Sequence, residues 1–105
     1  MTRGFRVAPT ADRDIDDQAA YLMEKAGVDL ALRFHAAVDA TFAAIARMPG
    51  GGQKWESDDP RLVGVRVRRI EGFPNLLAFH RIVDDQVEIV RVLHAARDLD
   101  SLLER

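Results

Sequence analysis

Histidine and arginine side chains gather in the second half of the chain, and these residue types could do chemistry on a phosphodiester. Cleavage of RNA requires a base for the 2′-hydroxyl, an acid for the leaving oxygen, and cations for the charge that builds up on the phosphate. A ribonuclease is therefore one function that the composition permits. The side chains that could serve it are Arg66, Arg68, His80, Arg81, His94 and Arg97.

The spacing of these residues argues against one complete catalytic set. Alternation along a strand places Arg66 and Arg68 on one face, whereas His80 and Arg81 are adjacent and must point to opposite faces. The one tyrosine, Tyr21, lies far upstream. We therefore expect no catalytic residues and a protein that acts by binding another macromolecule. A ribonuclease stays open as the alternative.

His94-x-x-Arg97-Asp98 is the sharpest local cluster in the sequence. In a functional interpretation it forms a recognition corner or part of a phosphate site. In a structural interpretation Asp98 caps the last helix and pairs with Arg97, while His94 hydrogen-bonds a backbone carbonyl. The residue types favour the structural interpretation, because charged residues at a strand-to-helix corner commonly cap helix ends.

Arginines on the predicted strands could form a docking surface for an acidic partner. Arginine suits this role because its planar fork binds carboxylates in bidentate fashion. Trp55 either pins its glycine-rich loop to the core or anchors an interface, where tryptophan is enriched. Solvated strand arginines are the alternative. The residues that we expect at a binding surface are Arg66, Arg68, Arg69, Arg81, Arg91, His94, Arg97 and Trp55.

The charge distribution argues against direct binding of DNA by this chain alone. The net charge is −2 over 105 residues, with an acidic first part and an arginine-rich stretch from 61 to 97 that is net +3. A protein that grips a phosphate backbone usually carries a clear basic excess. We therefore expect protein partners rather than nucleic acid.

Several other classes are not supported. The chain has no cysteine, and its three histidines are scattered, so we expect no disulfide, metal or other cofactor. Ser57 and Ser101 lie in contexts unsuited to a nucleophile. No apolar run approaches the roughly 20 residues of a membrane span, nor the length of a signal peptide. We expect a cytoplasmic protein without membrane contact.

Apolar periodicity predicts an α+β protein of one domain, residues 1–105. Thr10, Asp29 and Asp98 are the expected helix caps. The predicted order is a strand at 5–7, helices at 10–27 and 29–48, a mobile loop at 50–62, strands at 63–68, 76–83 and 87–93, and a tail helix at 98–105. We expect a helical hairpin packed on a small antiparallel sheet, with residues 87–93 as a central strand and the first strand at an edge.

Three stretches resemble the ParE branch of the RelE/ParE toxin superfamily. They are the helices ending in Ala46-Arg47-Met48-Pro49-Gly50, the strand from Phe73 to Arg81, and the run from Ile89 to Asp98. The last is close to the family's closing signature, in which the final strand enters a His-x-x-Arg-Asp corner. Many relatives carry tyrosine where this chain has His80.

The resemblance implies a toxin of a type II toxin–antitoxin system. The implied partners are a cognate antitoxin of the ribbon-helix-helix type with an acidic C-terminal tail, and DNA gyrase, which ParE-type members inhibit. A higher-order complex of toxin and antitoxin is also implied. RelE-type members instead cleave messenger RNA on the ribosome. A degenerate relative that only binds antitoxin is a third alternative.

Overall fold

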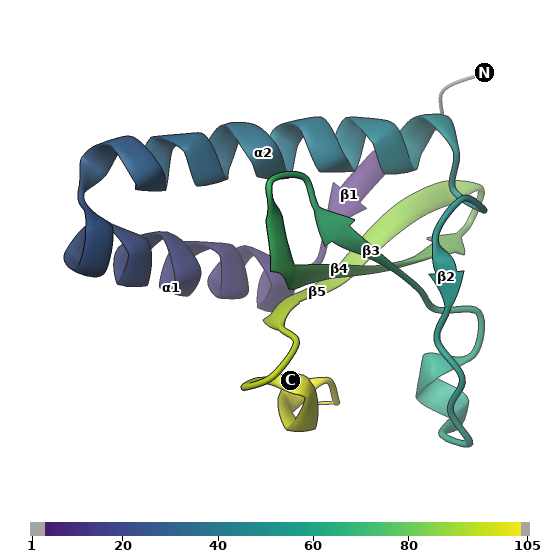
Figure 1. The fold of residues 1–105 in the computed structure, drawn as a ribbon. Helices are drawn as coiled ribbons and strands as arrows, with labels where there is room; N and C mark the ends of the chain where they lie inside the picture. The colour runs from purple at the N-terminus through teal and green to yellow at the C-terminus, as the bar shows by residue number, and fades with distance from the viewer. Residues whose placement is uncertain (1–3, 104–105) are drawn as a thin grey trace.

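The computed structural model describes residues 4–103 as two long helices and a five-stranded sheet (Figure 1). No helix within this range is long and apolar enough to cross a membrane. The elements are β1 (Phe5–Val7), α1 (Pro9–Ala26), α2 (Val28–Arg47), β2 (Gln53–Lys54), η1 (Pro60–Leu62), β3 (Arg66–Ile70), β4 (Phe73–Val83), β5 (Gln86–His94) and η2 (Leu99–Ser101).

The sheet is mixed, with strand order β1-β5-β4-β3-β2. The expected meander of the three late strands is confirmed, because β3, β4 and β5 pair antiparallel. The prediction of a small antiparallel sheet holds for β2 to β5, whereas β1, whose direction the sequence left open, pairs parallel to β5. No short turn joins these two strands, so nothing forces them to run in opposite directions. β1 lies at an edge and β5 in the interior, as predicted.

The main core lies between the helical hairpin and one face of the sheet. Phe34 of α2 is fully buried and meets Phe73 of β4 edge-on, with ring centroids 5.6 Å apart. Apolar residues that recur at helical spacing on the two helices, among them Ile15, Phe34 and Phe42, face this core. The buried members of this core are Ala11, Ile15, Phe34, Val38, Phe42, Ile45, Ile70, Leu76, Ala78, Val87, Ile89 and Val92.

A second, smaller apolar cluster lies apart from the main core, around Phe79 and Leu93. Leu102, just after η2, packs into it, so the tail contributes to its cover. The indole of Trp55 stands edge-on against the Phe79 ring, with centroids 5.2 Å apart. The interpretation that Trp55 pins its loop to the core is therefore confirmed.

The helix starts differ from the predicted ones. α1 begins at Pro9 with Ala8 in the N-cap position, so Thr10 lies inside the helix and does not cap it. Proline favours this first position because its fixed φ suits the helix and its missing N–H would be unpaired there. α2 follows directly after Gly27, so Asp29 lies in its first turn rather than at its cap. The predicted end of the first helix at Gly27 is correct, and the backbone φ of this glycine is 94°.

The strand boundaries also shift. β3 begins at Arg66 rather than Val63, which is exposed. β4 begins at Phe73 rather than at residue 76, and the turn before it lies at residues 71–72. The predicted loop at 50–62 contains β2 and η1. In place of the tail helix predicted at 98–105, the structure has the short turn η2. Residues 104–105 of that predicted helix lie outside the described range. Asp84 and Asp85 form the tight turn between β4 and β5, with positive φ at both residues.

Candidate functional site

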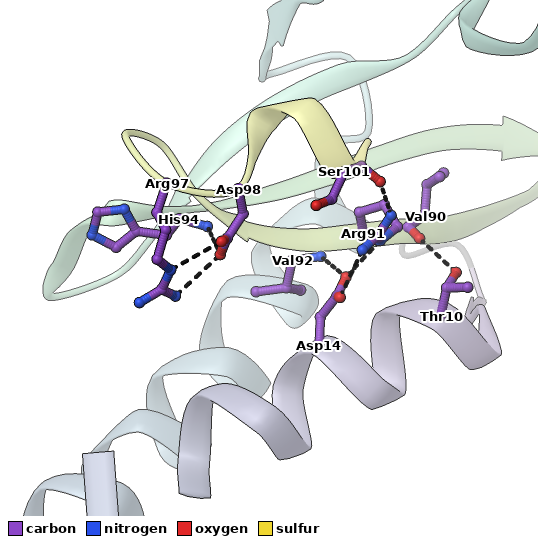
Figure 2. A network of polar contacts seen from close by, with 9 residues as sticks. All are labelled: Thr10, Asp14, Val90, Arg91, Val92, His94, Arg97, Asp98 and Ser101. Atoms are coloured by element: carbon purple, nitrogen blue, oxygen red, sulfur yellow. Dashed lines mark hydrogen bonds and ion pairs between the residues drawn. The ribbon is translucent and has the colours of Figure 1, made fainter. Parts of the chain in front are cut away.

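A bidentate ion pair joins α1 to the interior strand β5 (Figure 2). Arg91 donates to both carboxylate oxygens of Asp14, with distances of 2.7 and 2.9 Å. Arg91 also donates to the carbonyl of Ser101, which ties the tail to the same point. Both side chains are largely buried. The structure thus gives Arg91 an internal role, and its contact with a partner stays a prediction.

Beyond the end of β1, side chains of α1 form hydrogen bonds with backbone groups on the edge of β5. Asp14 accepts a hydrogen bond from the backbone N–H of Val92 at 3.0 Å. The hydroxyl of Thr10 donates to the carbonyl of Val90 at 3.4 Å (Figure 2). These contacts take the place of a neighbouring strand, because β1 pairs with β5 only as far as Ile89. An edge covered in this way offers fewer free groups for pairing with another chain.

The corner formed by His94, Arg97 and Asp98 is a closed set of hydrogen bonds. Arg97 donates to both carboxylate oxygens of Asp98, at 2.9 and 3.1 Å, and also to Gln18 on α1 at 3.0 Å. Its guanidinium lies over the ring of Tyr21, 5.4 Å from the centroid. The hydrogen bonds from Arg97 lower the pKa of Asp98 below its usual value, and those to Asp98 raise the pKa of Arg97. The geometry supports the structural interpretation of this motif.

Two details of that interpretation are wrong. Asp98 makes no side-chain cap for η2 and instead accepts a hydrogen bond from the backbone N–H of His94 at 3.2 Å. Nδ1 of His94 accepts from the N–H of Ala96, whereas we expected the ring to donate to a carbonyl. Backbone hydrogen bonds from Arg97 and Asp98 to the carbonyl of His94 close the same corner.

His80 lies with Arg66 and Arg68 at the other end of β4. Arg66 pairs in register with His80, and Arg68 with Ala78. The histidine is 1% exposed, and its Nε2 lies 3.1 Å from the carbonyl of Pro49. Burial lowers the pKa of His80, and the two nearby arginines lower it further, while the carbonyls of Pro49 and Ala78 act in the opposite direction. A neutral, buried ring is poorly placed to exchange protons with a substrate.

Arg81 is engaged elsewhere. It pairs with Glu88 at 3.2 Å and donates to the carbonyl of Arg61 at 3.0 Å. Alternation along β4 puts it on the face opposite His80, as the sequence predicted. Glu88 also pairs with Arg6 of β1 at 3.3 Å.

The structure does not bring the six candidate ribonuclease residues to one place. His94 of β5 lies opposite Leu76 of β4, four residues away from His80. At the usual rise per residue, the two histidines are therefore about 13 Å apart along the strands. Arg66 and Arg68 accompany His80, Arg97 accompanies His94, and Arg81 faces away. No group of three acidic or histidine side chains among residues 4–103 could hold a metal ion.

A polar-rimmed cavity of about 340 Å³ lies beside Trp55, Val67 and Leu77. Arg68 and Arg69 also line it, and Arg69 is exposed. Of the eight residues predicted for a binding surface, this cavity brings together Trp55 and these two arginines. Trp55 and Arg66 line another cavity of about 380 Å³, and Arg91 and Arg97 line one of about 330 Å³. Apolar walls beside cations suit a partner segment that carries both apolar and acidic side chains.

Sequence reasoning missed Asp14 and Gln18 as key contacts. Both fall on the buried stripe of α1, at helical spacing with Ala11 and Ile15. A polar residue inside an apolar stripe is a usable signal, because a buried polar group needs a partner. The partners, Arg91 and Arg97, lie more than 70 residues away, and the sequence alone gives no means to pair them.

The comparisons with known proteins agree with this architecture. A family model described as the ParE toxin of type II toxin–antitoxin system, parDE, matches residues 5–99. No curated protein matches the chain.

Solved structures share the fold. The chain is similar to one from the chromosomal ParDE TA system from P. aeruginosa, with 18% identity, coverage of 89% of this chain and 96% of that chain, and a TM-score of 0.73. It is also similar to one from the toxin–antitoxin complex RelBE2 of Mycobacterium tuberculosis, with 23% identity, coverage of 90% and 99%, and a TM-score of 0.61. At these identities the structures show a common fold. The family model, which spans nearly the whole chain, shows more: this chain belongs to the ParE toxin family of type II toxin–antitoxin systems.

Proposed function

We propose that this ParE-family toxin acts by binding DNA gyrase and that a cognate antitoxin neutralises it. Membership of the family is the observation that carries the proposal. The toxin itself catalyses no reaction in this proposal. It works as a folded docking surface, and its cytoplasmic target is a protein.

The scattered positions of the polar side chains support a binding role over ribonuclease chemistry. General acid–base catalysis requires groups within hydrogen-bond reach of one substrate. His80 is buried under Pro49, and His94 uses Nδ1 to hold its own corner. Arg81 and Arg97 are each paired with a carboxylate of this chain. These contacts are those of a stable scaffold.

The cavity beside Trp55 is the proposed docking site for the antitoxin. Val67 and Leu77 offer apolar contact, while Arg68 and Arg69 offer charge. An acidic, amphipathic tail that is disordered alone would fold as it binds, with its carboxylates on the arginines. The matched structures come from ParDE and RelBE2 toxin–antitoxin systems, which is consistent with such a partner. We further propose a ribbon-helix-helix antitoxin and a higher-order complex.

Induction of the chain alone in cells tests the target. Gyrase inhibition predicts filamentation and DNA-damage signalling with intact messenger RNA, and purified toxin should inhibit supercoiling by gyrase. Rapid arrest of translation with messenger RNA cut at ribosomes would contradict the proposal and favour the ribonuclease. Normal growth despite folded, abundant protein would favour a relative that only binds antitoxin.

Calorimetry against the antitoxin tests the docking surface separately. Arg68→Ala and Arg69→Ala should each weaken binding by roughly 1.5–3 kcal/mol if a charge-assisted hydrogen bond is lost. Arg66→Ala and Arg81→Ala test whether the surface extends along the neighbouring strands. Arg33→Ala, an exposed change on α2, is the matched control. Unchanged affinity for all the strand variants would discard the electrostatic part of the proposal.

A further inference from the structure

His80 lies directly beneath the chain that leaves α2. Its Nε2 is 3.1 Å from the carbonyl of Pro49, so the ring carries its proton there and donates to that oxygen. The other ring nitrogen, Nδ1, is buried and makes no hydrogen bond. A neutral imidazole that carries its proton on Nε2 fits this position, because Nε2 has an acceptor at hydrogen-bond distance and Nδ1 makes no hydrogen bond.

A second tether holds the same segment. Nη1 of Arg66 donates to the carbonyl of Gly52 at 2.8 Å. A Cβ on Gly52 would stand 3.1 Å from Cε1 of His80 and 2.8 Å from the carbonyl oxygen of Val67. There is thus no room for a side chain between Gly52 and the imidazole, and hydrogen bonds hold the segment 49–52 at Pro49 and at Gly52.

The tethered segment continues into Trp55. β2 pairs with β3 through only two residues, Gln53 and Lys54. The N–H of Trp55 then donates to the carbonyl of Val65 at 3.0 Å, and its indole rests on Phe79. Trp55 packs against the small cluster around Phe79, whereas the helices and the long strands share the main core.

The charges around His80 are unfavourable to a second proton. Arg66 and Arg68 approach from β3. The register partner on β5 is Ile89, which is apolar, and Arg47 at the end of α2 is exposed. None of the groups that act on His80 within residues 4–103 is an acid. Burial is the largest influence on the His80 pKa and lowers it, which agrees with this geometry.

We propose that His80 is a pH-sensitive latch that holds the segment from Pro49 to Trp55 against the sheet. When Nδ1 gains a proton, the ring becomes charged in a buried position beside two guanidinium groups. The ring then leaves its buried position, and residues 49–55 separate from the sheet while the helices stay packed. The proposal does not depend on the target of the toxin.

Trp55 makes the latch directly measurable, because it is the only tryptophan of the chain. Fluorescence emission should shift to longer wavelength as the pH falls from 8 to 5, with a midpoint below about 6.5, the ordinary histidine value. Helical circular dichroism should stay constant over that range. In His80→Gln the amide can still donate to Pro49 but does not titrate, so the shift should vanish. His35→Gln, an exposed change on α2, should leave it intact.

A second measurement keeps the proposal falsifiable if His80→Gln does not fold. Proton NMR of the wild-type protein follows each histidine ring, and the midpoint for His80 should coincide with that of the Trp55 emission. Separate midpoints would overturn the latch. Emission that is constant to pH 5, a shift that persists in folded His80→Gln, or loss of helix together with the shift would overturn it as well.

Discussion

Asp14 on α1 and Arg91 on β5 form a bidentate ion pair that joins three parts of the chain. The carboxylate also accepts the N–H of Val92, and the guanidinium also donates to the carbonyl of Ser101. The pair thus links the first helix, the interior strand and the tail at one buried point. Its contacts are internal to the protein, which makes it a determinant of stability.

Loss of this carboxylate breaks the buried ion pair. Asp14→Asn should lower the free energy of unfolding by about 3–5 kcal/mol, because the buried Arg91 guanidinium loses its bidentate bonds to the Asp14 carboxylate. Asp16→Asn is the matched control on the same helix, since Asp16 is exposed and should change stability by less than about 0.5 kcal/mol. Urea denaturation at neutral pH measures both. Equal stability of the two variants would contradict the structural role of the pair.

Phe34 and Leu32 lie two residues apart on α2 and differ fully in burial. Phe34→Ala should cost about 3–5 kcal/mol, because it empties the space between the helix and Phe73. Leu32 is 61% exposed, so Leu32→Ala should be nearly neutral. Thermal unfolding followed by circular dichroism compares them. A similar loss for both would show that α2 is packed in another orientation.

The glycine run after α2 provides a steric test. Gly52→Ala should destabilise the protein by roughly 1–3 kcal/mol, because the added methyl meets the Val67 carbonyl and the His80 ring. Gly50→Ala is the control, since nothing lies within 4 Å of a Cβ there. Chemical denaturation gives the free energies, and Trp55 emission reports whether the segment has moved. Tolerance of alanine at Gly52 would place this backbone further from β3 and β4.

The stability of the fold should depend on pH through His80. Its pKa is lowered in the folded state, so the unfolded chain binds a proton more readily. The contribution of neutral His80 is complete above about pH 6.5 and is lost progressively as the pH falls toward the folded pKa. Wild-type Tm should therefore decrease below pH 6.5 more steeply than that of His80→Gln. Parallel pH profiles for the two proteins would contradict a buried neutral histidine.

Local patterns predicted most of the elements and the main core. The stripe that includes Phe34 and Phe42 has the period of a helix buried on one side, and the Asp84-Asp85 turn has residues suited to positive φ. These features depend on neighbours in the sequence. The predicted caps at Thr10 and Asp29 failed because Pro9 and Gly27 set the helix starts more strongly than a side-chain oxygen does.

The candidate site was harder to predict, because its contacts join distant segments. The sequence placed His80 and Arg81 on opposite faces correctly, since that follows from alternation alone. It did not show that Arg91 pairs with Asp14, 77 residues away, or that His80 contacts the carbonyl of Pro49, 31 residues away. A local sequence pattern gives no information on partners at such separations. The folded structure is therefore needed to distinguish arginines that make internal ion pairs from arginines that are exposed.

β5, which lies between β1 and β4 in the sheet, is also the last of the described strands in the chain. β5 ends at His94, and neither β1 nor the Asp14 carboxylate can make its contacts before β5 has been synthesised. Asp14 and its partner Arg91 are 77 residues apart in the sequence. During translation the first helix therefore has no sheet edge to close against until most of the chain has emerged. Contacts of such long sequence separation form slowly. We therefore expect the first helix and the sheet to pack together late in folding, after most of the chain has been synthesised.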